Sequence, residues 1–125
     1  MEINTQSKTP KPWGHELLLA LNEYYALKSI TVNENCRTSL QSHVSKVESV
    51  FVVDGRMLLE AGPSADELGE FEFGPGDSYT LVAGEVHRVT GITDVIYLEA
   101  SSPHLDDVVR FQDEYGRATS DTDSQ

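Results

Sequence analysis

The sequence predicts an all-β domain, built as a closed barrel or a jelly roll. Its apolar residues fall in short segments, several of which alternate with polar residues, as in strands buried on one face. Turn sequences such as Asp54-Gly55 and Gly74-Pro75-Gly76-Asp77 separate these segments, because glycine readily adopts the positive φ values that tight turns need. Short, evenly spaced strands are typical of barrels and jelly rolls. The predicted strands are Glu16–Ala20, Ala26–Val32, Thr38–His43, Glu48–Val53, Arg56–Glu60, Glu70–Phe73, Ser78–Val82, Val86–Thr90 and Val95–Ala100.

Two segments are candidates for helical structure. Asn22–Tyr25 is expected to form a single turn between two strands. His104–Asp113 is expected to form a helix near the end of the chain, because Leu105, Val108 and Val109 give it one apolar face. Every other apolar segment is too short for a helix of ordinary length.

The chain is expected to form one domain, because 125 residues suit a single hydrophobic core. Residues 1–9 are polar and unpatterned and are predicted to be a flexible N-terminus. Residues 118–125 have little to bury and are predicted to be a disordered acidic tail. The domain is therefore expected to span residues 10–117.

The composition of the chain limits the kinds of partner and the cellular compartment that we expect for it. The formal net charge is −12, from 21 acidic and 9 basic side chains, which disfavours nucleic acid and anionic membranes as partners. The apolar runs are far shorter than the roughly 20 residues that cross a bilayer. The N-terminus lacks the pattern of a secretory signal, and the single Cys36 has no partner for an internal disulfide. We therefore expect a cytoplasmic protein.

A group of polar residues falls at positions expected to face the barrel interior. Gln41 and His43 are two residues apart, so their side chains leave one face of an extended strand. Residues 44–47 predict a hairpin that places Glu48 across from His43, and its alternation with Val50 and Val52 turns Glu48 inward. Burying such groups is costly unless they are paired or bind an ion.

His87, near the start of another predicted strand, adds a second imidazole to this group. The set Gln41, His43, Glu48 and His87 would supply two nitrogen and two oxygen ligands to one divalent metal ion. Such a set suits Zn²⁺, Mn²⁺, Fe²⁺, Co²⁺ or Ni²⁺ without choosing among them. Gln41 has an alternative interpretation as a hydrogen-bonding residue of the interior, because amides are uncommon ligands for these metals.

The same residues carry a resemblance to a known family. The pattern Gln41-x-His43-x4-Glu48-x6-Gly55 resembles the first cupin motif, with glutamine in the place of the first histidine. Gly76-x5-Val82-x-Gly84-x2-His87-x3-Gly91 resembles the second motif, with valine and glycine in the places of proline and asparagine. The resemblance implies a cupin β-barrel, a double-stranded β-helix or jelly roll.

Further segments narrow the resemblance to type II mannose-6-phosphate isomerase, whose domain often forms the C-terminal part of a bifunctional enzyme. The resemblance implies a metal-dependent conversion of mannose 6-phosphate to fructose 6-phosphate through a cis-enediol. The segments that carry it are Lys11-Pro-Trp-Gly14, Leu27-Lys-Ser-Ile30, Ser39-Leu-Gln-Ser-His43, His87-Arg88, Asp106-Asp-Val-Val-Arg110 and Asp113-Glu-Tyr-Gly-Arg117.

An isomerase of this kind needs a proton carrier and a cationic pocket for the phosphate. Glu48, Lys28 and Tyr79 are the candidates for moving a proton between the two carbons. Arginine can donate two parallel hydrogen bonds to a phosphate, so Arg88 and Arg110 are the first candidates for the phosphate-binding pocket. Lys46 and Arg37 are further candidates, with an alternative interpretation as ordinary surface charges.

Two other functions remain open at this point. A non-catalytic cupin that binds a sugar or sugar phosphate is favoured by the departures from the family pattern at Val44, Ser45 and Gly91. An iron- or nickel-dependent oxygenase would use the same barrel and ligands, since a fold does not fix a function. By resemblance, we also expect a homodimer formed through edge strands or exchanged N-terminal segments.

Overall fold

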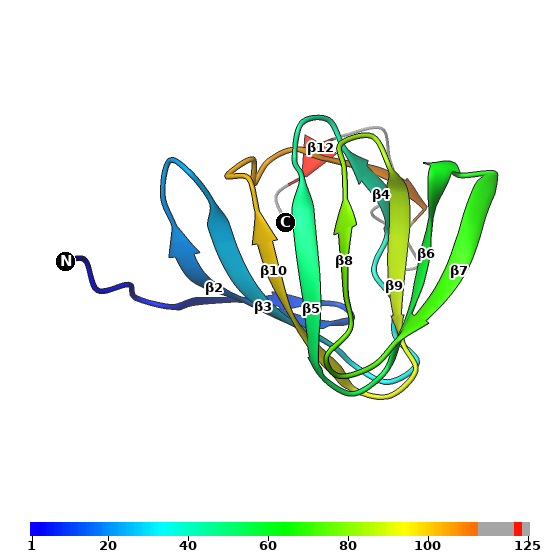
Figure 1. The fold of residues 1–125 in the computed structure, drawn as a ribbon, viewed down its shortest axis with the longest axis horizontal. Coiled ribbons are helices and arrows are strands. Elements are labelled where there is room, and N and C mark those ends of the chain that lie inside the picture. Colours follow the sequence, from blue (N-terminus) through cyan, green and yellow to red (C-terminus); the bar gives the residue numbers. More distant parts are fainter. Residues whose placement is uncertain (113–121, 124–125) are drawn as a thin grey trace.

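The computed structural model describes residues 1–112 and 122–123, and all of their regular structure is β. Twelve strands form two six-stranded sheets that face each other as the halves of a barrel (Figure 1). In spatial order, sheet A contains β1 (Ser7–Lys11), β2 (Gly14–Leu21), β3 (Ala26–Val32), β10 (Val95–Ser101), β5 (Glu48–Asp54) and β8 (Ser78–Leu81). Sheet B contains β12 (Thr122–Asp123), β11 (Val108–Gln112), β4 (Leu40–His43), β9 (Val86–Gly91), β6 (Met57–Ser64) and β7 (Glu67–Phe73).

The predicted all-β class is confirmed, and alternation along the strands explains how the barrel closes. In β5, Glu48, Val50 and Val52 are buried while the residues between them are exposed. The register pairs Val95 with Val32 at one end of β10 and Ser101 with Glu48 at the other. The barrel interior therefore has an apolar end and a polar end, with the polar end at the top of Figure 1.

The apolar end holds the hydrophobic core, to which both sheets contribute. Trp13, from the turn between β1 and β2, is buried there. The other core residues are Ile30, Val32, Val50, Val52, Met57, Leu59, Val89, Val95 and Tyr97. Among the described residues, no helix has the length and hydropathy to span a membrane.

The structure differs from two local predictions. The segment predicted as a helix, His104–Asp113, instead contains strand β11, because Val108 and Arg110 alternate inward and pair with β4. The predicted hairpin between His43 and Glu48 is also wrong, because β4 belongs to sheet B and β5 to sheet A. Residues 44–47 cross between the sheets, so His43 faces the barrel interior from sheet B and Glu48 faces it from sheet A.

The chain ends are described only in part. The first strand begins at Ser7, within the segment predicted to be flexible, and pairs with β2 along its whole length. Asn22 forms the predicted turn, since its side-chain oxygen accepts hydrogen bonds from the Tyr24 and Tyr25 N–H groups. The segment Asp113-Glu-Tyr-Gly-Arg117, the predicted boundary at Arg117 and most of the predicted tail lie outside the described residues.

Two glycines with positive φ allow a direct test of the turn geometry. Gly55, between β5 and β6, has φ of 81°, and a Cβ there would lie 2.0 Å from the Asp94 carbonyl oxygen. Gly76 has φ of 91°, but a Cβ there would meet nothing within 4 Å. We expect Gly76→Ala to lower the free energy of unfolding by about 1–2 kcal/mol through backbone strain alone. Gly55→Ala should lower it by about 2–5 kcal/mol, because strain and overpacking add.

Urea denaturation of both variants measures this difference. Equal losses of stability in the two would contradict the close approach of Gly55 to Asp94.

Candidate metal centre

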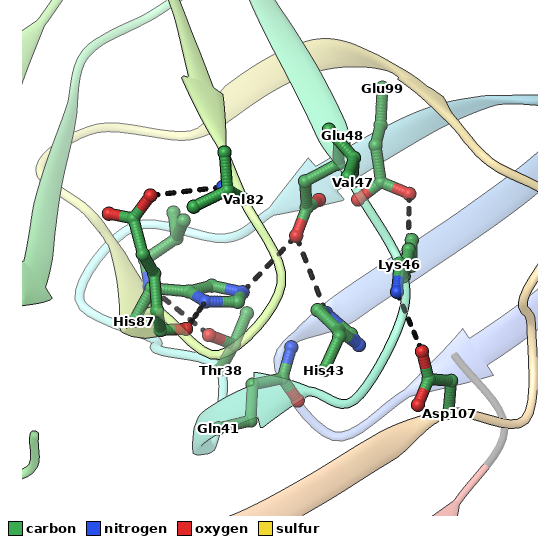
Figure 2. Close-up of polar contacts among 12 residues, drawn as sticks. Thr38, Gln41, His43, Lys46, Val47, Glu48, Val82, His87, Glu99 and Asp107 are labelled. Atoms are coloured by element: carbon green, nitrogen blue, oxygen red, sulfur yellow. Dashed lines mark hydrogen bonds and ion pairs between the residues drawn. The ribbon is translucent and has the colours of Figure 1, made fainter. Parts of the chain in front are cut away.

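Four side chains meet at the polar end of the barrel. Gln41 and His43 come from β4, Glu48 is the first residue of β5, and His87 comes from β9. Gln41 lies opposite His87 in the register of the β4–β9 pair, so both point inward. Figure 2 shows the rings of His43 and His87 directed toward the Glu48 carboxylate, with Gln41 beside them. Strands from both sheets thus bring three of the predicted ligands to one point, with Gln41 next to them.

The geometry of His43, Glu48 and His87 suits a bound cation. Glu48 Oε1 lies 3.3 Å from His43 Nε2 and 3.3 Å from His87 Nε2. One possible ligand atom from each residue lies within 4.8 Å of the others, and all three residues are buried. Both ring nitrogens of His43 and Glu48 Oε1 are buried without a hydrogen bond. Such groups cost about 1–3 kcal/mol each when left unsatisfied, and a metal ion among them would satisfy them.

The protonation state of the two imidazoles also favours metal binding. His87 Nδ1 lies 3.1 Å from the Glu85 carbonyl oxygen, which only accepts hydrogen bonds, so Nδ1 is the donor. A neutral His87 ring then has its lone pair on Nε2, the nitrogen nearest Glu48. Burial lowers the pKa of His43 below its usual value, although the Glu48 contact opposes this shift. A neutral imidazole is the form that binds metal.

Gln41 is oriented differently from the three other predicted ligands. Its Oε1 accepts a hydrogen bond of 2.9 Å from the Ser39 hydroxyl, which itself accepts one of 3.3 Å from Arg110 Nε. The oxygen that would bind a metal is therefore engaged with Ser39. To act as a ligand, the Gln41 amide must turn over and leave this hydrogen bond.

A second carboxyl lies beside Glu48 and was missed by the sequence interpretation. Burial and then the Glu48 charge raise the pKa of Glu99 to about 8. Lys46 Nζ, 3.1 Å from Glu99 Oε2, opposes this rise but is outweighed. Burial also acts to raise the pKa of Glu48, yet its contacts with Glu99, His43 and His87 hold it well below the usual value. The pKa values of the two carboxyls are therefore shifted in opposite directions, with Glu48 the more acidic of the pair.

Gln41, Glu48 and His87 line a cavity of about 30 Å³, which has room for an ion and a water molecule or two, whereas His43 is not part of its wall. Tyr79 from β8 also lines it, and burial followed by the charges of Glu48 and Glu99 raises the pKa of Tyr79 well above its usual value. The Tyr79 hydroxyl therefore stays protonated. The remaining polar residues of the wall include Glu16, Thr38, Ser39, Glu99 and Arg110.

The predicted phosphate and proton-transfer residues are distributed unevenly around this cavity. Of the described residues predicted to contact phosphate, Arg110 lines it, whereas Arg88 and Arg37 do not. Arg88 follows His87 and so faces the other side of β9, in register with Glu60. Lys46 is fully buried against Glu99, and Lys28 Nζ lies 3.1 Å from Glu16 Oε1.

One carboxylate outside the cavity holds the connection between His43 and Glu48. Asp107 Oδ1 accepts a hydrogen bond of 2.8 Å from Val44 N–H, and its Oδ2 accepts bonds of 2.7 Å from Ser45 and Lys46. Burial acts to raise the pKa of Asp107, but these hydrogen bonds outweigh burial and lower that pKa. On the other side, the Gly84 N–H donates to the His43 carbonyl at 2.8 Å. The ligand segments are thus tied to one another through their backbones.

Comparisons with known proteins identify relatives of this chain. Residues 1–113 match the family described as mannose-6-phosphate isomerase C-terminal. The xanthan biosynthesis protein XanB of Xanthomonas campestris is 30% identical over 121 residues, which cover 93% of this chain and 25% of XanB. The mannose-1-phosphate guanylyltransferase ManC of Salmonella typhimurium is 32% identical over 112 residues, which cover 86% of this chain and 22% of ManC. The chain thus spans about a quarter of the length of these relatives.

Solved structures share the fold at low sequence identity. The capsular polysaccharide assembling protein CapF of Staphylococcus aureus superposes with a TM-score of 0.76 and 14% identity, covering 87% of this chain and 35% of CapF. KdgF of a Halomonas species gives 0.68 and 14%, covering 81% of this chain and 89% of KdgF. Oxalate decarboxylase of Lactobacillus farciminis gives 0.72 and 15%, covering 84% and 33%. The predicted cupin fold is confirmed, and the chain belongs to the mannose-6-phosphate isomerase C-terminal family.

Proposed function

We propose that this domain binds one divalent metal ion through His43, Glu48 and His87, and converts mannose 6-phosphate to fructose 6-phosphate. The observation that carries the proposal is the buried triad, in which three ligand atoms lie within 4.8 Å of one another. Family membership supports the choice of substrate. Gln41 would complete the ligand set once its amide has turned over.

Each part of the reaction has a candidate among the chain's own residues. A bound metal ion would supply electrostatic stabilisation of the enediolate that forms between C1 and C2. Glu99 is our candidate for the proton carrier, because it lines the cavity while Glu48 is directed at the two imidazoles. Tyr79 lines the cavity as well and would donate a hydrogen bond to a substrate oxygen. Lys28 is the weaker candidate, because Glu16 neutralises it.

Arg110 is the best candidate for the phosphate. It is buried, it lines the cavity, and its Nε is already directed by Ser39. The planar guanidinium of arginine suits phosphate, because it can donate two parallel hydrogen bonds to it.

A non-catalytic cupin that binds sugar phosphates is the second candidate function. The specific observation in its favour is the cavity volume of about 30 Å³, which leaves little space for a hexose phosphate beside an ion. Turnover measurements separate the two functions, whereas metal binding alone does not.

The metal proposal predicts the effect of removing each imidazole. We expect His43→Ala and His87→Ala to lose stoichiometric binding of Mn²⁺, Zn²⁺, Co²⁺, Fe²⁺ or Ni²⁺, and to lose the thermal stabilisation that the ion gives the native state. His15→Ala and His104→Ala are the matched controls, since both histidines lie outside the triad. Elemental analysis after dialysis measures the metal content. Unchanged metal content in His43→Ala and His87→Ala would refute the site.

A third prediction concerns the connection that carries His43 and Glu48. Asp107→Ala removes the acceptor of three backbone N–H groups, so the two ligands should be held less firmly. We expect the metal dissociation constant to rise about tenfold to a hundredfold, as for other residues that orient ligands. Asp106→Ala is the control, because Asp106 is exposed and adjacent. Isothermal titration calorimetry compares the two, and equal dissociation constants would contradict this role for Asp107.

The isomerase proposal is tested by turnover. A coupled assay should detect fructose 6-phosphate formed from mannose 6-phosphate by the metal-loaded protein. We expect Arg110→Ala to raise the KM about tenfold or more with unchanged metal content, and Arg110→Lys to recover part of the loss. No product with any of the five metals would exclude the isomerase and leave the sugar-phosphate-binding function.

A further inference from the structure

Lys11 is a basic residue of the cavity wall that the sequence interpretation did not assign to the phosphate. It is the last residue of β1 and lines the cavity together with Arg110 of β11. In the β1–β2 register Thr9 lies opposite Glu16, which is buried and also lines the cavity. Lys11 is two residues from Thr9, so it lies on the same inward side of the sheet. Lys8 alternates with them and takes the outward side.

The basic residues of this wall stand out on so acidic a protein. Among the described residues that line the cavity, Lys11 and Arg110 are the lysine and the arginine. The chain has only 9 basic residues and a net charge of −12, so an anion binds only where local positive charge outweighs this field. Acidic residues of the wall have other partners, in the pairs Glu16–Lys28, Glu99–Lys46 and Glu48–His43.

The exposure of the wall shows where the cavity approaches the surface. Among the described residues that line it, Lys11 and Tyr79 are partly exposed, whereas the others are buried. Lys11 belongs to β1 and Tyr79 to β8, the two edge strands of sheet A. The cavity is therefore closest to solvent at the two edges of this sheet.

The edge at Tyr79 suits an anion poorly. Tyr79 there lines a second hollow, a groove of about 240 Å³ formed with residues of β6 and β7. The wall of this groove is mainly apolar and includes Leu59, Phe71 and Phe73, and among its described residues the charged one is Glu85. Apolar surface and a carboxylate both disfavour a phosphate. The edge at Lys11 is therefore the one that suits an anion.

The strand register sets Arg110 at a useful distance from the metal centre. Arg110 lies opposite Gln41 in the β11–β4 pair, and Gln41 lies opposite His87 in the β4–β9 pair. Neighbouring strands are about 4.8 Å apart, so the backbones at Arg110 and His87 are about 10 Å apart. This span is comparable to the length of a six-carbon sugar phosphate.

We propose that Lys11 and Arg110 together bind the phosphate group of a sugar phosphate whose other end lies at the metal centre. Lys11 is the outer cation, at the edge of sheet A, and Arg110 is the buried one. The ammonium group supplies charge that adapts to the ligand, and the planar guanidinium fixes the orientation of the phosphate. The sugar-phosphate ligand is taken from the proposed function, but this binding requires no turnover.

Mannitol 6-phosphate allows binding to be measured without turnover, because it lacks the carbonyl group that isomerisation needs. In isothermal titration calorimetry with the metal-loaded protein, we expect Lys11→Ala to raise the dissociation constant about tenfold, since a charged hydrogen bond to phosphate is lost. Lys11→Arg should recover most of the affinity, because it restores the charge. Lys8→Ala is the matched control, since Lys8 is an exposed lysine on the outward side of the same strand.

Two further measurements separate a loss of phosphate binding from a loss of structure. Metal content and the thermal unfolding midpoint of Lys11→Ala should match those of the wild type, because Lys11 lies outside the ligand triad. Lys11→Gln gives a second neutral variant that keeps a long side chain, and it should lose as much affinity as Lys11→Ala. Wild-type affinity in these two variants, an equal loss in Lys8→Ala, or no binding of mannitol 6-phosphate by the wild type overturns the proposal.

The result is independent of the isomerase assay. If mannitol 6-phosphate binds through Lys11 but mannose 6-phosphate is not converted, the isomerase fails and the phosphate site stands. If mannose 6-phosphate is converted with the same KM by Lys11→Ala and by the wild type, the isomerase stands and the role of Lys11 fails.

Discussion

The charge of Glu48 lies inside the barrel between two imidazoles, and the arrangement of the polar end depends on it. A buried carboxylate is stable only where neighbouring groups compensate for lost hydration. His43 and His87 lie on one side of it at 3.3 Å, and Glu99 with its partner Lys46 lies on the other. Because the pKa of Glu99 is raised and that of Glu48 is lowered, the negative charge is favoured on Glu48, the carboxylate that faces the imidazoles. The centre is therefore prepared for a cation by the protein alone.

The two-sheet architecture explains how residues distant in the sequence reach this point. Residues 44–47 carry the chain from sheet B to sheet A, so His43 and Glu48 approach each other across the barrel instead of along a ladder. Asp107 and the His43 carbonyl fix that crossing through backbone hydrogen bonds. The β4–β9 register then sets Gln41 beside His87. A small displacement of any of these connections would move a ligand.

The sequence predicted most of the strands and the convergence of His43, Glu48 and His87, because alternation decides which face of a strand a residue occupies. Glu48, Val50 and Val52 were assigned inward for this reason, and they are buried. The same rule, applied to Val95, Tyr97 and Glu99, would have revealed the second carboxyl. The rule would also have shown that Arg88 faces away from the cavity that His87 faces, since adjacent residues of a strand point to opposite sides.

Other features needed the tertiary structure. A short connection such as residues 44–47 fits a hairpin or a crossing between sheets equally well. The apolar residues Leu105, Val108 and Val109 suit either a helical face or a strand, and only pairing with β4 decides for the strand. Asp107 is one of two adjacent aspartates, and nothing in the local sequence separates the residue that binds the backbone from its exposed neighbour.

The division of the barrel into an apolar end and a polar end also bears on how such a protein can change. The hydrophobic core contains none of the three candidate ligands, although Trp13 and Tyr97 belong to the core and also line the cavity with Glu48 and His87. Substitutions among the ligands leave the core intact, and substitutions in the core leave the ligand types intact. A lineage could therefore lose or exchange its metal chemistry while the barrel persists, provided that the buried Glu48 charge stays compensated.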